Sequence, residues 1–150
     1  MKYPNRQNAA QQIVEMGKRL YEKNMAAAND GNISVKIGEN AVLVTPSGVS
    51  KGYLQAETLA VVDLENNLIE GTLPPSSETK MHLRVYRENP QIGGVVHAHP
   101  VFGTAFAAAE IALDKPILIE SVIGIGKIPL APFATPGTDE VPNSVAPFVK

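Results

Sequence analysis

The segment Gly-Gly-Val-Val-His-Ala-His-Pro at residues 93–100 is the stretch on which the interpretation of this sequence depends. Its apolar first half is typical of a β-strand, and Pro100 discourages the strand from continuing. Side chains two residues apart on a strand point to the same face, with Cα atoms roughly 6.5–7 Å apart. His97 and His99 can therefore reach one metal ion, although histidines in such a pattern also serve as surface or packing residues. We expect the pair at the exit of a strand, where α/β proteins tend to place their sites.

The composition is that of a globular protein. The chain has 150 residues, of which 44% are hydrophobic and 19% charged, enough for one domain with a hydrophobic core. The net charge of −2, without a long run of one sign, argues against nucleic acid or an anionic membrane as the main partner. Because cysteine is absent, any metal would be held by His, Asp, Glu or water. The sequence shows no signal peptide and no apolar run that could span a bilayer, so we expect a cytoplasmic protein.

Apolar spacing predicts a mixture of helices and strands. We expect helices at residues 8–28, 78–87 and 101–109, and the start of another within residues 137–150. We expect strands at residues 33–37, 41–45, 59–64, 93–97, 117–123 and 127–132, with the first two forming a hairpin. The chain contains no repeat, low-complexity tract or linker, so we predict a single α/β domain over residues 1–150.

Glu78 is the main candidate for acid–base chemistry. The run Pro-Pro-Ser-Ser-Glu at residues 74–78 predicts a helix start, with a serine at the N-cap and the glutamate in the first turn. The carboxylate could hold a metal or move a proton, or it could only complement the helix dipole. The hydroxyls of Ser76 and Ser77, next to unpaired helix N–H groups, offer an anion site.

Two further loops could hold a phosphate. Gly31 and Asn32, and the run Thr-Pro-Ser-Gly at residues 45–48, combine small residues with hydrogen-bond donors. Such loops can bind phosphate through backbone amides, although each is also compatible with an ordinary turn. Neither a Walker motif nor a dinucleotide-binding motif is present.

Several other ionisable residues allow more than one interpretation. We interpret His82 as a packing or supporting residue, with a metal ligand as the alternative. Glu120 could reach the site or face water at a strand edge. Lys51 and Lys127 are expected to be solvated, and residues 139–140 to begin and cap a helix.

Five motifs, in this order along the chain, resemble the class II aldolase/adducin family, in particular its branch of fuculose-phosphate aldolases. They are Gly-Asn-Ile-Ser at 31–34, Thr-Pro-Ser-Gly at 45–48, Pro-Ser-Ser-Glu at 75–78, Val-Val-His-Ala-His at 95–99 and Ala-Pro-Phe-Ala-Thr-Pro-Gly-Thr at 131–138. The resemblance covers nearly all of the chain. It implies a three-layer α/β/α fold around a mostly antiparallel sheet, a zinc ion, a phosphorylated ketose as substrate, and a homotetramer with sites at subunit interfaces.

The resemblance also implies roles for individual residues. His97 and His99 match two zinc ligands. Glu78 matches the catalytic acid/base, which also touches the metal when substrate is absent. The phosphate-binding positions of the family are matched by Gly31, Asn32, Ser47, Gly48, Ser76 and Ser77.

The implied reaction is the zinc-dependent, reversible aldol cleavage of a phosphorylated ketose, such as L-fuculose 1-phosphate, to dihydroxyacetone phosphate and an aldehyde. A metal would stabilise the developing enediolate, a carboxylate would move the proton, and the phosphate would position the substrate. Three alternatives within the family stay open. They are a 4-epimerase acting on ribulose 5-phosphate, a dehydratase of a methylthio-sugar phosphate, and an adducin-like binding domain without catalytic activity.

The sequence departs from the family in two places. The family's third zinc histidine, its C-terminal helices and a C-terminal tyrosine that donates a proton have no counterpart here. We therefore interpret residues 1–150 as a domain that lacks the family's C-terminal part. Residues 120–121 stand where some fuculose-type members place an aromatic residue that helps to select the aldehyde.

Overall fold

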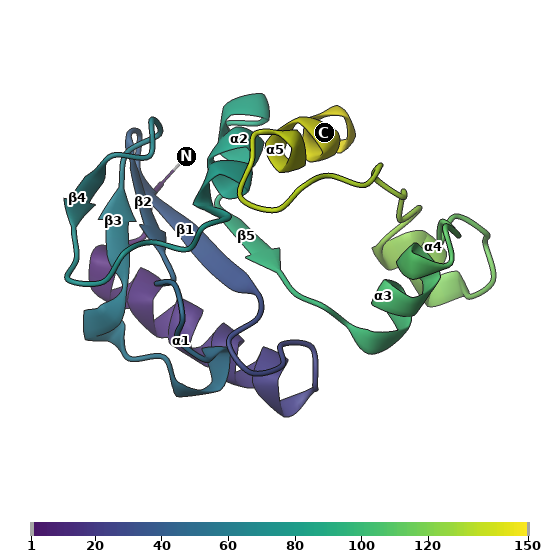
Figure 1. The fold of residues 1–150 in the computed structure, drawn as a ribbon, viewed down its shortest axis with the longest axis horizontal. Helices are drawn as coiled ribbons and strands as arrows, with labels where there is room; N and C mark the ends of the chain where they lie inside the picture. Colours follow the sequence, from purple (N-terminus) through teal and green to yellow (C-terminus); the bar gives the residue numbers. More distant parts are fainter. Residues whose placement is uncertain (1, 150) are drawn as a thin grey trace.

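The computed structural model describes residues 2–149 and is built around one antiparallel sheet (Figure 1). The strand order is β4-β3-β2-β1-β5, and every neighbouring pair is antiparallel. The strands are β1 (Asn32–Gly38), β2 (Ala41–Val44), β3 (Ala60–Val62), β4 (Leu68–Glu70) and β5 (Gly94–His97). The expectation of a mostly antiparallel sheet is confirmed.

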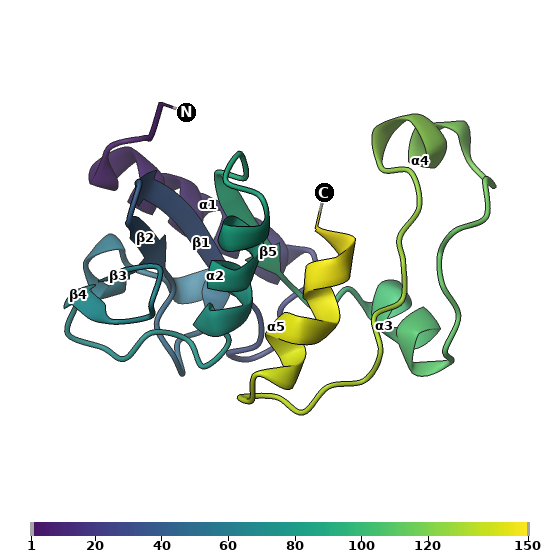
Figure 2. The same ribbon diagram turned by 90° about the horizontal axis from the view of Figure 1, so that it is seen from above.

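Helices cover both faces of this sheet, which gives three layers (Figure 2). α1 lies on one face, α2 lies on the other, and α5 packs against α2. The helices are α1 (Arg6–Glu22), α2 (Thr79–Glu88), α3 (Val101–Ala108), α4 (Ile119–Gly124) and α5 (Glu140–Val145), with 3₁₀ turns η1 (Lys51–Tyr53), η2 (Ala56–Thr58) and η3 (Ala146–Phe148). Within residues 2–149, no helix is both long and apolar enough to cross a membrane.

The alternation of side chains along the strands produces two apolar cores. Because successive residues of a strand point to opposite faces, Leu43 packs in the core beneath α1, whereas Val42 and Val44 pack against α2. Leu83 and Tyr86 of α2 complete the second core. The three-layer α/β/α fold is therefore present.

Strand register brings two of the predicted site residues together. In the antiparallel pairing of β1 with β5, Asn32 lies opposite His97. Both residues stand at the same end of the sheet, since Asn32 begins β1 and His97 ends β5.

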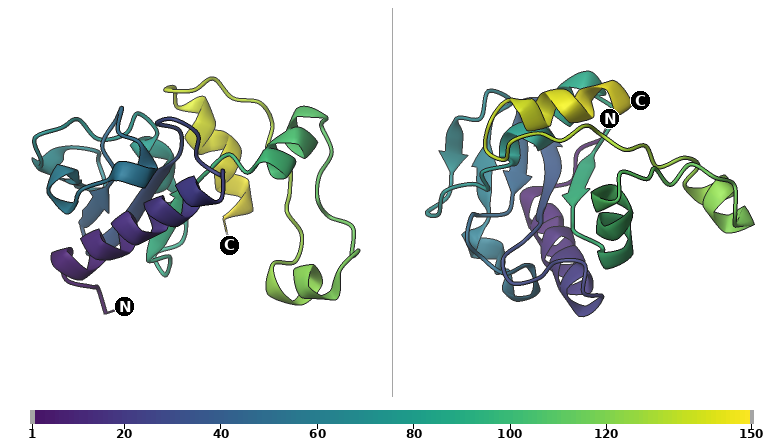
Figure 3. Two further views of the ribbon diagram at one scale, coloured as in Figure 1. Left: turned by 90° about the horizontal axis from the view of Figure 1, so that it is seen from below. Right: turned by 45° about the vertical axis from the view of Figure 1, so that its right-hand side comes forward.

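Residues 101–135 leave the sheet as an arm, and residues 136–149 return to α2 (Figures 1 and 3). We refer to residues 101–135 as the arm and to the remaining described residues as the body. The arm carries α3 and α4. The interpretation of residues 1–150 as a single domain stays a prediction.

Two parts of the predicted secondary structure are wrong. The first helix ends at Glu22, because residues 23–30 form turns in which Asn24 and Ala28 have positive φ angles of 54° and 45°. The strands expected at 117–123 and 127–132 do not form. Residues 119–124 are helical, and Ile128 makes only an isolated bridge with Leu113. A strand needs a neighbour to pair its backbone groups, and the arm lies away from the sheet.

Candidate active site

One cavity of about 190 Å³ collects the site residues that the sequence predicts. It lies where β1 begins, β5 ends and α2 starts. Its lining includes the catalytic, metal-binding and phosphate-binding candidates, namely Gly31, Asn32, Ser47, Gly48, Ser76, Ser77, Glu78, His97 and His99. Asn29, Asp30, Pro46 and Lys51 complete it.

The backbone conformation explains why glycine stands at positions 31 and 48 of the two candidate phosphate-binding loops. Gly31 has φ +75°, and a Cβ atom there would lie 2.8 Å from the His97 carbonyl oxygen, so the loop can approach β5 only with glycine. Gly48 also has a positive φ, of 74°. The loop at 45–48 is tied to the chain before α2, because Ser47 N–H donates to Pro74 O (2.9 Å) and Ser76 N–H donates to Thr45 O (3.1 Å). All three candidate phosphate-binding segments therefore face one cavity.

The start of α2 differs from the prediction. The N-cap is Glu78 rather than a serine, and its side chain makes no capping bond. Ser76 supports this turn instead, since its carbonyl accepts from Thr79 N–H at 3.0 Å and its hydroxyl accepts from Glu78 N–H at 3.4 Å. Within the described chain, the hydroxyls of Ser47 and Ser77 make no hydrogen bond. These two hydroxyls are thus available to a ligand in the cavity.

Glu78, His97 and Asn32 form a compact polar group. Glu78 Oε2 lies 2.6 Å from His97 Nδ1, and Asn32 Nδ2 donates to the same carboxylate oxygen at 3.2 Å. Burial lowers the pKa of His97, and His99 adds to this effect, while Glu78 opposes it. A neutral His97 that donates from Nδ1 to Glu78 presents the lone pair of Nε2 on its other side.

The two histidines fit one edge of a metal site. Their Nε2 atoms are 3.2 Å apart. Two nitrogen ligands of a tetrahedral zinc ion, each about 2.0–2.1 Å from the metal, would be separated by about 3.3 Å. On the far side of the pair, His99 Nδ1 lies 3.7 Å from Asp30 Oδ2.

A complete protein ligand set is not formed by residues 2–149. No group of three His, Asp or Glu side chains in this range is arranged to hold one metal ion. Glu78 contacts His97 at Nδ1, the nitrogen that faces away from His99, and this contact orients the His97 ring. The role of Glu78 as a ligand stays a prediction.

Comparison with known proteins identifies the family of this chain. The family described as Class II Aldolase and Adducin N-terminal domain matches residues 11–150. The chain belongs to the class II aldolase and adducin family.

Curated members of the class II aldolase family similar to this chain differ in activity. A 3-oxo-tetronate 4-phosphate decarboxylase of Haemophilus influenzae is 35% identical over 139 residues, which cover 89% of this chain and 65% of the relative. An L-fuculose phosphate aldolase of Methanococcus maripaludis (strain S2) is 31% identical over 139 residues, covering 93% of this chain and 75% of the relative. This chain thus spans less than two thirds of the length of the decarboxylase.

A solved structure in the same family has the same fold. YgbL of Klebsiella pneumoniae, named with the candidate activities aldolase, epimerase and decarboxylase, superimposes with a TM-score of 0.87 at 29% identity. The match covers 97% of this chain and 72% of the YgbL chain.

His82 lies outside the cavity of this class II aldolase domain, as the packing interpretation expects. It is buried, and its Nδ1 lies 2.7 Å from the hydroxyl of Ser34, which lies 2.8 Å from that of Tyr86. Burial lowers the pKa of His82 to about 3, with a smaller contribution from His97. His82 is therefore neutral in the folded protein.

The sequence analysis missed Lys51. It was expected in solvent, but it is only 2% exposed and lines the cavity. Its position three residues after Gly48, close to the loop at 45–48, is the one signal that could have indicated this. Glu120, by contrast, is exposed and does not line the cavity, and it lies on the helix α4 instead of the expected strand edge.

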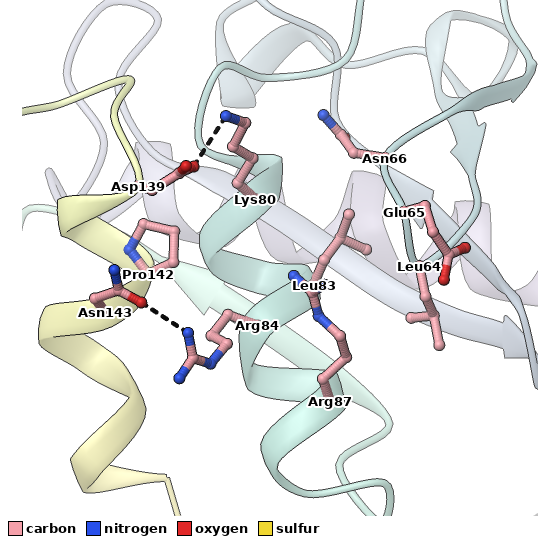
Figure 4. A pocket seen from close by; sticks show the side chains of 10 residues that line it. All are labelled: Leu64, Glu65, Asn66, Lys80, Leu83, Arg84, Arg87, Asp139, Pro142 and Asn143. Atoms are coloured by element: carbon pink, nitrogen blue, oxygen red, sulfur yellow. Dashed lines mark hydrogen bonds and ion pairs between the residues drawn. The ribbon is translucent and has the colours of Figure 1, made fainter.

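A larger cavity, of about 440 Å³, lies between α2, α5 and residues 64–66 (Figure 4). Its basic side chains are largely occupied, because Lys80 pairs with Asp139 at 3.0 Å and Arg84 donates to Asn143 at 2.8 Å. Asp139 thus begins α5, as predicted, but its side chain binds Lys80 instead of capping the helix. With none of the candidate residues in its wall, this cavity is not the candidate active site.

Proposed function

We propose that the protein cleaves the bond between the α and β carbons of a phosphorylated ketose, counted from its carbonyl group. The preferred reaction is reversible aldol cleavage of a ketose 1-phosphate, such as L-fuculose 1-phosphate, to dihydroxyacetone phosphate and an aldehyde. The observation that supports it most is that Glu78 and the histidine pair line one cavity together with the three candidate phosphate-binding segments. The similarity to the Methanococcus aldolase agrees with it.

His97 and His99 would hold a divalent cation, zinc by preference, through their Nε2 atoms. When bound, this cation supplies a Lewis acid that stabilises negative charge on the substrate's carbonyl oxygen. Further ligands of the cation would come from Glu78, the substrate, water or residues other than those that the structure describes.

Glu78 would move the protons. Its carboxylate takes the proton from the hydroxyl group on the carbon that becomes the aldehyde. The breaking bond leaves its electron pair on the ketone fragment as an enediolate, and protonation of that carbon yields dihydroxyacetone phosphate. Asn32 and His97 both contact Oε2 and keep the carboxylate in place between these steps.

The phosphate would bind away from the reacting bond. Ser47, Ser76 and Ser77 offer hydroxyls, and the loops that contain Gly31, Asn32 and Gly48 offer backbone N–H groups. Binding energy at the phosphate would thereby orient the carbonyl toward the histidine pair.

A second candidate is decarboxylation of a phosphorylated 3-oxo sugar acid, favoured by the 35% identity to the Haemophilus decarboxylase. Loss of CO₂ from the carbon next to the carbonyl of 3-oxo-tetronate 4-phosphate gives the same enediolate, and protonation again gives dihydroxyacetone phosphate. The two reactions therefore need the same stabilisation of charge. They differ in that decarboxylation requires no removal of a hydroxyl proton.

We further propose a homotetramer located in the cytoplasm. Large apolar side chains on the arm, including Phe102 and Phe133, are exposed, and contact with other subunits would cover them.

The test is to supply zinc to the purified protein and offer L-fuculose 1-phosphate, ribulose 5-phosphate and 3-oxo-tetronate 4-phosphate separately. Aldol cleavage releases dihydroxyacetone phosphate with an aldehyde, decarboxylation releases it with CO₂, and epimerisation releases neither fragment. We expect aldehyde release to dominate. A protein that binds no metal and converts none of these compounds would contradict the proposal and favour an adducin-like binding role.

A further inference from the structure

Lys51 is a buried cation in the wall of the active-site cavity. It begins the η1 turn, and its ammonium group donates to the carbonyl oxygens of Asn29 (2.9 Å) and Val49 (2.5 Å). Within residues 2–149 it forms no ion pair with a carboxylate. Carbonyl oxygens satisfy N–H groups but carry no net charge, so a buried positive charge is left without a counter-charge.

The Asp30 carboxylate does not compensate for the burial of the Lys51 charge. Asp30 raises the pKa of Lys51, but burial, the larger effect, lowers it. The Asp30 carboxylate lies instead on the side of the histidine pair, 3.7 Å from His99 Nδ1. A buried lysine in this situation is stabilised when an anion binds beside it.

The two carbonyls that hold Lys51 belong to the two glycine-containing loops. Asn29 lies two residues before Gly31, and Val49 directly follows Gly48. Lys51 therefore joins both loops, and two of its three N–H groups are used in doing so. The third N–H is bound by none of the described residues, and Lys51 lines a cavity that also offers the unbonded hydroxyls of Ser47 and Ser77.

We propose that Lys51 binds the phosphate group of the substrate and makes the site selective for phosphorylated over unphosphorylated sugars. This inference rests on the proposed function for the identity of the ligand. A phosphate monoester carries up to two negative charges, which serine hydroxyls and backbone amides contact but do not neutralise. An ammonium group provides a point charge for such an anion.

Lys36 offers a matched control. It is also buried, with 5% of the residue exposed, but it lies on β1 beside the ring of Tyr3 and outside the cavity. Lys51→Met and Lys36→Met each replace a buried lysine by an uncharged side chain of similar length. Only the first removes charge from the cavity.

The experiment measures binding of inorganic phosphate and dihydroxyacetone phosphate by calorimetry. We expect Lys51→Met to weaken both affinities at least ten-fold and Lys36→Met to change them less than two-fold. Binding of unphosphorylated dihydroxyacetone should change little in either variant, whereas a merely structural role would weaken it in Lys51→Met too. Equal phosphate affinity in the two variants, or no phosphate binding by the wild type, would overturn the inference.

A measurement on the wild-type protein covers the case in which Lys51→Met does not fold. In spectra of ¹³C,¹⁵N-labelled lysine, the side-chain signal of Lys51 should shift on addition of inorganic phosphate, and that of Lys36 should not. An unchanged Lys51 signal would contradict the inference. Because phosphate binding requires no turnover, a protein that binds phosphate through Lys51 but cleaves no sugar phosphate would refute the proposed function alone.

Discussion

The body and the arm use apolar side chains in opposite ways. In the body, Ile13, Leu43 and Val62 are fully buried in the two cores. In the arm, Phe102 is 83% exposed and Phe133 is 93% exposed. The candidate site lies in the body, where strand register and packing fix its residues. The comparison indicates that the body positions the chemistry, whereas the arm presents a surface that folding of residues 2–149 leaves uncovered.

The largest expected effect is on catalysis and comes from the body. Glu78→Gln keeps the shape of the side chain and can still accept the proton of His97 Nδ1, but it can no longer take a proton from the substrate. We expect the rate of cleavage to fall by about 10²–10⁴-fold. Steady-state kinetics with whichever of the three test compounds the wild-type protein converts would measure this loss.

Glu57→Gln is the control, because Glu57 is exposed on the η2 turn away from the cavity. It should retain wild-type activity. A Glu78→Gln protein that is folded by circular dichroism and as active as Glu57→Gln would show that Glu78 moves no proton.

The second prediction compares the stability of the two regions directly. Leu43→Ala opens a cavity in the core under α1 and should reduce the free energy of unfolding by about 2–5 kcal/mol. Ile123→Ala on α4 removes a side chain that is 81% exposed and should change it by less than about 0.5 kcal/mol. Urea denaturation measures both. Equal losses would mean that the arm packs in solution as the body does.

The third prediction concerns the pH dependence of the body. The pKa of His82 is about 3 in the folded protein and near 6.5 when unfolded, so between these values the unfolded chain binds one more proton. Stability should therefore fall as the pH decreases below 6.5, by up to about 1.4 kcal/mol per pH unit from this group. Replacing His82 with Asn should flatten the slope between pH 6.5 and 5, measured by urea denaturation. Identical slopes for wild type and variant would contradict the assignment.

The smallest expected effect on stability comes from the arm. Phe102→Ser should change the free energy of unfolding of the dissociated chain by less than about 0.5 kcal/mol, because the ring makes few contacts within the chain. It should nevertheless reduce the fraction of tetramer seen by analytical ultracentrifugation. A wild-type protein that stays monomeric at high concentration would disprove the proposed assembly.

The local sequence pattern predicted the secondary structure of the body well and that of the arm poorly. The alternation of apolar and polar residues over 33–37 and the strand pattern over 41–45 predict two neighbouring strands that form a hairpin. The structure contains this hairpin. The segment from Ile117 to Ile128 is rich in β-branched residues, which favour strands. Among the described residues no neighbouring strand pairs with it, so strand propensity alone led to a wrong prediction.

The candidate site shows a similar limit. The motifs around Ser76, Glu78 and His97 could be found because chemistry restricts their residue types and spacing. Lys51 could not be found from the sequence in this way, because its burial depends on the loops at 29–31 and 47–49 meeting in space. The contact of Glu78 with Nδ1 of His97, rather than with the face shared with His99, is likewise set by tertiary geometry.

The chain's three histidines allow the central claim to be measured in one spectrum. The imidazole nitrogens are followed by ¹⁵N NMR while zinc is added to the wild-type protein. The account predicts that the Nε2 signals of His97 and His99 shift together at one equivalent of zinc and that the signals of His82 stay unchanged. A shift of only one of the pair, or none at all, would contradict the claim that these two side chains bind one metal ion.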